Sequence, residues 1–375
     1  MQIIKESAPH LRRKDSLSIM MLDVIIALLP TIIFAFVIYP LAALRNLLVS
    51  AATMELCEFV FVLIKNRVPY DGEKHTLKEH WERQKKAYTI NNFLVPLVSA
   101  LIFSLIMPVA ADSTGILYVA LILGSVFGIV IGKLVFGGTG KNIFNPAAVG
   151  MVFAKLCFGS HYTYPDNSYY THLSDVVYTG STPLASSSLK DGSFSFFSYS
   201  SLDLFLGKVP GTLGEGFKVT ILLGLIYMFI RHTIDWRIPL LYVGAFAFDM
   251  LFVGLILQGA KGVNAVDFLL HELLSGGLLF GATFMATDPV TAPITRPGKM
   301  MYGALLGSLT VIIRLFAALP EGVAFSLLIA NISTSVFDYY KWSDDRYNWK
   351  KILTIALLVL LPLLIVIWAT CVEVF

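Results

Sequence analysis

The chain has 375 residues, of which 56% are hydrophobic and 14% charged, and its mean hydropathy is +0.74. This composition is far more apolar than the core of a soluble domain requires, so it indicates one integral-membrane domain over residues 1–375. The net charge of +3 is small and the basic residues lie in short polar segments, which argues against nucleic-acid binding. The three separated cysteines form no CxxC pair, so no zinc site or iron–sulfur cluster is expected.

Apolar segments of about 20 residues, the length that crosses a hydrocarbon core, recur along the whole chain. They predict an all-α polytopic membrane protein with about ten to eleven transmembrane helices. The expected helices cover residues 19–39, 41–64, 92–109, 115–136, 143–158, 217–230, 238–257, 267–287, 301–317, 323–340 and 352–372.

Lys and Arg set the expected orientation, because they are enriched in cytoplasmic loops. The N-terminal segment 1–18 and the loop 65–91 are both rich in basic residues, so both are expected in the cytoplasm. Lys133 and most of the other basic residues then fall in loops on the same side. This places the long polar segment 159–216 on the outer face and leaves 352–372 as an additional C-terminal hydrophobic segment.

Two segments interrupted by Gly and Pro resemble each other, LVFGGTGKNIFNPAAVG and LLFGATFMATDPVTAPI. Asn145-Pro146 of the first corresponds to Asp288-Pro289 of the second. Paired breaks of this kind are typical of a two-fold inverted repeat with a broken helix in each half. We expect the breaks to face one another and to hold a polar ligand at membrane depth. A coincidental similarity of two loops remains the alternative.

Ionisable residues inside predicted spans are costly and are therefore candidates for function. Asp23 and Asp249 are candidates for an ion path, and Asp249 lies near mid-span with no cation nearby in sequence. Glu55, Glu58 and Asp288 belong to the same class. The alternative is that these acids pair with Lys, Arg or other subunits only to satisfy their burial.

The outer segment contains the stretch TGSTPLA, in which Gly180 and Ser181 precede Thr182 and Pro183 follows it. By residue chemistry alone this is a turn-rich polar loop. The stretch resembles the flavinylation motif of the RnfD/NqrB family of membrane subunits, in which the last Thr bears FMN through a phosphoester. The resemblance implies covalent FMN on Thr182, attached by a flavin transferase.

The resemblance extends over residues 7–340 and includes SAPH, MMLDVIIALLP, GGTGKNIFNPAAVG, LGKVPGTLGEG, WRIPL, FMATDPVTAP and YGALLGSLTVIIR. It implies an electron-transfer subunit of an Rnf-type ferredoxin:NAD⁺ oxidoreductase complex, which couples electron flow to Na⁺ or H⁺ translocation. The implied location is the bacterial inner membrane, among lipid and the partner subunits A, B, C, E and G. Relatives in the NqrB line also hold a noncovalent riboflavin, for which the breaks at Asn145 and Asp288 are the candidate site.

Two other functions remain open. A passive channel or permease also has paired broken helices around a two-fold axis. A scaffold subunit without an active flavin would keep the same membrane pattern. The Thr182 segment and visible flavin absorbance of the purified protein distinguish the electron-transfer subunit from a permease. A scaffold subunit would carry no covalent flavin adduct.

Overall fold

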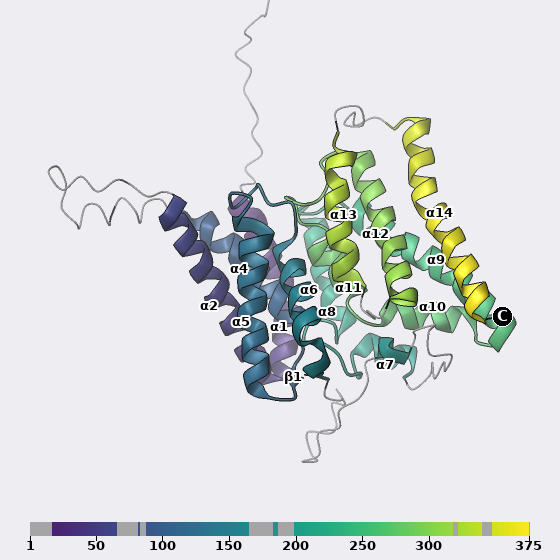
Figure 1. Ribbon diagram of the computed structural model, residues 1–375, viewed down its shortest axis with the longest axis horizontal. Coiled ribbons are helices and arrows are strands. Elements are labelled where there is room, and N and C mark those ends of the chain that lie inside the picture. Colours follow the sequence, from purple (N-terminus) through teal and green to yellow (C-terminus); the bar gives the residue numbers. More distant parts are fainter. Residues whose placement is uncertain are drawn as a thin grey trace, which may run out of the picture.

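The computed structural model describes residues 17–65, 82, 88–164, 183–186, 199–317, 322–339 and 347–374. In this part of the chain the protein is almost entirely helical (Figure 1), which confirms the predicted all-α membrane fold. A helix is present at each predicted span. The helices are α1 (Leu17–Ile38), α2 (Pro40–Lys65), α4 (Ile90–Ile106), α5 (Thr114–Ile129), α6 (Pro146–Phe158), α7 (Ser201–Leu206), α8 (Lys218–Ile230), α9 (Arg237–Lys261), α10 (Ala265–Leu274), α11 (Leu278–Phe280), α12 (Arg296–Phe316), α13 (Val323–Phe337) and α14 (Trp349–Val374).

The helices differ in their capacity to cross a bilayer. Within the described residues, six are long and apolar enough: α1, α2, α5 with its extension, α9, α12 and α14. The pair α10–α11, bent by 58°, forms a seventh if it is counted as one span. The predicted count of about ten to eleven also includes the shorter helices α4, α6, α8 and α13. The inverted repeat stays a prediction.

One short antiparallel pair joins two links at the same end of the molecule. β1 (Ala110–Ala111) pairs with β2 (Tyr162–Thr163), which follows α6. Figure 1 shows β1 and α7 at the lower end, away from the visible upper ends of α13 and α14. The start of the predicted outer segment is therefore fixed against the α4–α5 link. The orientation of these two ends relative to the cytoplasm stays a prediction.

The first break is made by local backbone chemistry. Asn145 caps α6, because its Oδ1 accepts hydrogen bonds from the amides of Ala147 and Ala148 at 3.0 and 3.3 Å. Pro146 occupies the first helical position, where no amide donor is needed. Three glycines just upstream have φ between +84° and +110°, a conformation that ends the preceding helix: Gly137, Gly138 and Gly140.

Both breaks follow a π-helical turn. One turn, Val130–Leu134, extends α5, and the other, Gly281–Met285, follows α11. A π turn inserts an extra residue into a helix and is frequent at functional sites. The hydropathy pattern does not indicate either turn, because a single inserted residue changes it very little.

Small residues allow the helices around the breaks to pack closely. A Cβ at Gly128 of α5 would lie 2.6 Å from the carbonyl oxygen of Pro146. A Cβ at Gly307 of α12 would lie 2.7 Å from the carbonyl oxygen of Tyr242 in α9. Close backbone contact at small residues is the usual way in which helices associate in lipid.

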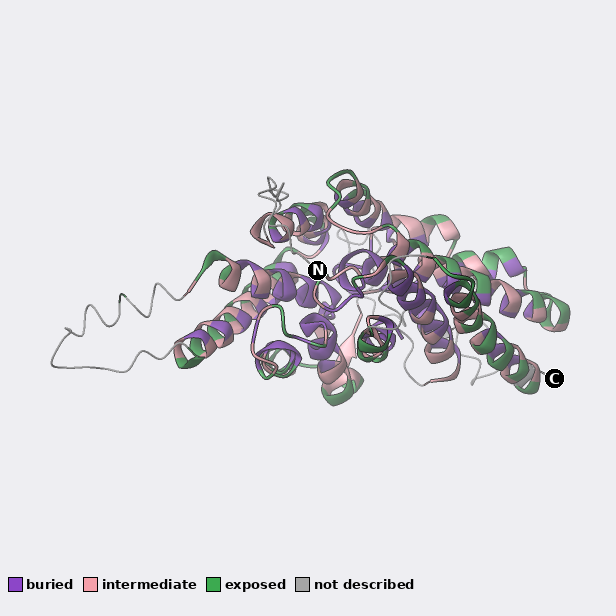
Figure 2. Cartoon of the chain, turned by 90° about the horizontal axis from the view of Figure 1, so that it is seen from above, coloured by how far each residue is buried: buried purple, intermediate pink, exposed green. Residues whose placement is uncertain are grey.

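Apolar side chains face outward as well as inward, as expected for a protein whose solvent is lipid. Figure 2 shows buried residues gathered on the inner faces of the helices and exposed ones on the outer faces. α14 lies at one edge (Figure 1). Only 11% of its most apolar 18-residue stretch is buried. Most of its surface is therefore available to lipid or to another subunit.

Asp235, in the loop before α9, holds α9 and α12 together at one end of the molecule. It accepts from the Arg237 amide at 3.1 Å and pairs with the Arg237 guanidinium and the Lys299 amine, each at 3.0 Å. Partial burial raises the pKa of this carboxyl, but these hydrogen bonds and charges outweigh burial and lower it below 3.8.

We expect the stability contributed by Asp235 to be complete above pH 3.8 and to be lost as the pH falls through the lower pKa of the folded protein. The Asp235→Asn variant should therefore lose stability near neutral pH and show a weaker acid dependence than the wild type. Thermal unfolding in detergent between about pH 2 and pH 7, a range that extends below the ordinary carboxyl pKa of 3.8, measures both effects. Equal acid slopes in the two proteins would contradict the assignment.

Candidate functional site

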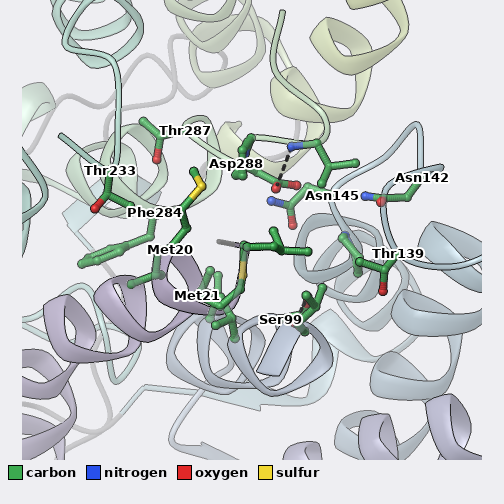
Figure 3. Close-up of a pocket in the computed structure, with 18 of the residues that line it drawn as sticks. Met20, Met21, Ser99, Thr139, Asn142, Asn145, Thr233, Phe284, Thr287 and Asp288 are labelled. Atoms are coloured by element: carbon green, nitrogen blue, oxygen red, sulfur yellow. Dashed lines mark hydrogen bonds between the residues drawn. The ribbon is translucent and has the colours of Figure 1, made fainter. Parts of the chain in front are cut away.

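An internal cavity lies where the two breaks meet. The Asn145 side chain donates to the carbonyl oxygen of Met285 at 3.2 Å, which joins the first break directly to the second. Asn145, Pro146, Asp288 and Pro289 all line this cavity. Figure 3 shows Asn142, Asn145 and Asp288 near one another, with Met21 and Ser99 across from them.

The cavity combines apolar walls with a few polar groups, the pattern of a small-molecule site. Met20, Met21 and Phe284 are among its apolar side chains. Its polar groups include Asn142 and Thr139, whose buried hydroxyl has no partner among the described residues. The space open to a water-sized molecule is about 50 Å³, enough for a few waters.

Asp288 organises the second break. Its carboxylate accepts from the Val290 amide at 3.2 Å and from the Thr291 hydroxyl at 3.0 Å, which closes a tight turn after the π segment. Asp288 does not cap a long helix as Asn145 does, because α12 begins only at Arg296 with Thr295 as its cap. The two breaks therefore differ in local geometry although both reach the cavity.

Lys133 corrects one expectation from the sequence. We expected it in a cytoplasmic loop, but it lies in the π turn after α5 with its side chain only 1% exposed. Its amine pairs with Glu58 of α2 at 3.0 Å, and Glu58 is 3% exposed. Lys133 also lines the cavity. The available signal was its position inside an apolar run, IGKLVFG, where a lysine requires a buried partner.

The other acidic candidates divide into paired and unpaired groups. Asp23 of α1 contacts Arg231 at 3.2 Å and accepts from the Tyr227 and Thr233 hydroxyls at 3.1 Å each, so its polar atoms are satisfied. The contacts of Asp23 match the structural alternative, in which the acids pair to satisfy burial. Glu55 is intermediate, because its Oε2 accepts from the Tyr88 hydroxyl at 3.0 Å while its Oε1 is buried without a hydrogen-bond partner among the described residues.

Asp249 has a different environment. It is fully buried in α9, and neither carboxylate oxygen has a hydrogen-bond partner among the described residues. The Ser308 hydroxyl of α12 is likewise buried without a hydrogen-bond partner among the described residues. An unpaired carboxylate in this setting is costly, so Asp249 remains the candidate for an ion path.

A buried charged cluster near the α10–α11 bend was not found from the sequence. The Arg314 guanidinium donates to the carbonyl oxygens of Glu272 and Ser275 at 2.6 and 3.2 Å and lies 3.4 Å from the Glu272 carboxylate. It also covers the ring of Phe246 at 4.9 Å. Arg314 thereby ties the end of α10 to α12.

The predicted flavin-bearing residue Thr182, with Gly180 and Ser181, lies outside the described residues. Pro183 begins a short 3₁₀ turn, Pro183–Ser186, and Leu184 within it is only 3% exposed. This turn borders a second, smaller cavity near the α10–α11 bend, lined by Glu215, Lys218, Gly276 and others. The chain next to Thr182 is thus fixed to the helical scaffold.

The fold and the cavity define a polytopic α-helical membrane protein with two helix breaks that meet at an internal polar site. The chain belongs to the NQR2, RnfD, RnfE family, whose sequence model matches residues 4–345. The family predicted from the sequence is thereby confirmed. The match ends before α14.

Three relatives illustrate the membership. The chain is 32% identical over 336 residues to the D subunit of the Na⁺-translocating ferredoxin:NAD⁺ oxidoreductase complex of Acetobacterium woodii, covering 89% of this chain and 92% of the relative. It is 28% identical to the D subunit of the ion-translocating oxidoreductase complex of Haemophilus influenzae, covering 89% and 95%. It is 35% identical to the B subunit of the Na⁺-translocating NADH-quinone reductase of Chromohalobacter salexigens, covering 68% of this chain and 60% of that relative.

Proposed function

We propose that this protein is the flavin-carrying electron-transfer subunit of an Rnf-type, ion-translocating ferredoxin:NAD⁺ oxidoreductase complex in a bacterial inner membrane. The observation that carries the proposal is the similarity to the D subunit from Acetobacterium woodii over 92% of that relative's length. The similarity to the B subunit of the quinone reductase covers only 60% of its length and carries less weight. Subunits A, B, C, E and G, a flavin transferase and lipid are the proposed partners.

We propose that FMN is joined to the Thr182 hydroxyl through a phosphoester. A covalent tether replaces a binding equilibrium with a fixed position, which suits a group that exchanges electrons with neighbouring centres. It also retains the flavin on a face where mass action could not hold a dissociable cofactor. Leu184, two residues after Thr182, is buried at the end of the molecule near α7 and α10. Its burial supports attachment of the flavin at this end of the molecule.

We expect the peptide that contains Thr182 to carry the mass of FMN less one water when the protein is produced with a flavin transferase. Intact mass and a tryptic map measure this adduct, because Lys190 and Lys208 provide cleavage sites downstream. The adduct should be absent in Thr182→Ala and present in the control Thr171→Ala, which lies on the same tryptic peptide outside the TGSTPLA stretch. An unmodified Thr182 in the assembled complex would contradict the proposal and favour a permease or a scaffold subunit.

We further propose that the cavity between the breaks holds a noncovalent riboflavin. Its apolar walls and the Asn142 and Asn145 amides suit a flat heterocycle with polar edges. The cavity has room for only a few waters as it stands, so entry of the ring requires the flexible Met20 and Met21 side chains to repack.

We expect denatured protein to release a second flavin that is not attached to Thr182. Met21→Trp should fill the cavity and abolish this release while the covalent adduct remains. Leu22→Trp is the matched control, because Leu22 is the next residue of α1 and is 44% exposed on its outer face. Release of no flavin from wild-type protein, measured by fluorescence after denaturation, would remove this proposal.

We propose that Asp249 takes part in the movement of the coupling ion, Na⁺ or H⁺. Its full burial without a hydrogen-bond partner among the described residues supports this role, whereas the contacts of Asp23 now favour a structural one. Asp249→Asn should lower ion uptake by vesicles that contain the complex while the covalent flavin is retained. Unchanged uptake would assign Asp249 to a subunit contact.

A further inference from the structure

Leu184 occupies a position that the polar sequence around it does not predict. Its neighbours in the stretch STPLASSS are small or polar, yet its side chain is only 3% exposed. It belongs to the 3₁₀ turn Pro183–Ser186, which lies beside the end of α10. Burial of a leucine side chain is worth about 1.5–3 kcal/mol, enough to hold a short turn in place.

The Leu184 side chain packs against Gly276, and we call this contact the seat. Gly276 has φ of +63°, a conformation that favours glycine, and it lies in the bend between α10 and α11. A Cβ at this position would lie 2.3 Å from the Leu184 Cδ1 atom. Any other residue at this position would strain the backbone and displace the Leu184 side chain.

Buried polar contacts hold the seat rigid. The Lys218 amine donates to the carbonyl oxygen of Glu215 and lies 3.5 Å from that of Gly276. The Arg314 guanidinium donates to the carbonyl oxygen of Ser275, the residue before Gly276, at 3.2 Å. The bend is therefore fixed from two sides, by α8 and by α12. A side chain placed on it takes a defined position relative to the membrane helices.

We propose that Leu184, seated on Gly276, is the positioning residue that fixes the flavin-bearing Thr182 relative to the helical scaffold. This inference rests on the proposed function for the identity of the group at Thr182. The seat itself is independent of that group. Leu184 touches no reacting atom and acts only by holding the chain two residues away.

The statistics of flexible chains show how strongly the seat limits the position of a residue close to Leu184 in the chain. A flexible chain has an r.m.s. extent of about 5–6 Å times the square root of its residue number, so two residues permit about 8 Å. If Leu184 were not held in place, the nearest described residues along the chain would be Thr163 and Tyr164 on one side and Tyr199 on the other. A flexible chain of that length would have an r.m.s. extent of about 20 Å. Fixing Leu184 therefore reduces the range of positions open to a residue two positions away by more than half.

The experiment measures this range with spin labels and does not require a flavin. One label is attached at Thr182→Cys and the other at Ile294→Cys, which is 81% exposed, after Cys57, Cys157 and Cys371 have been replaced by alanine. Pulsed dipolar spectroscopy on the purified full-length chain in nanodiscs then reports the distance distribution between the two labels.

We expect a narrow distribution in the parent protein and in the conservative variant Leu184→Met. In Leu184→Ala and Gly276→Ala, the width should increase about twofold, as the chain extents above imply. The matched control is Leu202→Ala, which removes a leucine of α7 that is 64% exposed and should leave the distribution narrow. Equal widths in the parent and in Leu184→Ala would overturn the proposal.

A second readout connects the seat to electron transfer. Among complexes that carry the FMN adduct on Thr182, Leu184→Ala should show a lower rate of flavin reduction than the parent, and Leu184→Met should show the parent rate. Absence of the adduct in every variant would defeat the proposed function but not the seat, which the spin labels test alone. An unchanged reduction rate in adduct-bearing Leu184→Ala would overturn the positioning role.

Discussion

Replacing Arg314 with methionine is expected to lower the free energy of unfolding by about 3–5 kcal/mol, because it removes the guanidinium that pairs with the buried Glu272 carboxylate. The two side chains are 1% and 0% exposed, and Arg314 also donates to two carbonyl oxygens at the end of α10. The loss therefore includes the hydrogen bonds that end that helix. Thermal or denaturant-induced unfolding of the purified protein in detergent measures the change.

The matched control is Lys350→Met, at an exposed position near the start of α14. A surface substitution of this kind usually changes stability by no more than about 0.5 kcal/mol. The Arg314→Met/Glu272→Leu double variant should regain part of the loss, because it also removes the buried carboxylate. If Arg314→Met were as stable as the control, the pair would have no structural role.

Glu58→Leu should cost a similar amount, about 3–5 kcal/mol, because it leaves the Lys133 ammonium unpaired next to the cavity. The two groups are 3.0 Å apart and almost fully buried. Adding Lys133→Met should recover most of the loss. Leu56→Ala, two residues away and 62% exposed, serves as the control. A fully additive double variant would show that the two side chains do not interact.

Hydropathy predicted the helices well because the bilayer imposes one simple requirement, a continuous apolar segment with its backbone bonded internally. α2 and α9 therefore lie within a few residues of their predicted limits. The same requirement does not specify where a helix bends. The 58° bend at Ser275 to Gly277 and the π turn at Gly281–Met285 lie inside what was predicted as one span, 267–287.

The candidate sites were predicted to different extents for a physical reason. Asn-Pro and Asp-Pro mark helix breaks by backbone chemistry, so Asn145 and Asp288 could be chosen from the sequence alone. The partners of buried charges could not, because Glu58 and Lys133, or Glu272 and Arg314, are far apart in the chain. Thr182 has no chemical signal of its own, and only the family resemblance distinguishes it from other loop threonines.

The bend at Gly276 and the turn at Asp288 lie on one short stretch of chain, with the π turn Gly281–Met285 between them. This stretch therefore borders the seat of Leu184 at one end and the internal cavity at the other. A π turn holds a surplus residue and is frequent at functional sites. The two proposed flavin positions are therefore linked through the same short stretch of chain, so a substitution in its π turn can be tested for an effect at both.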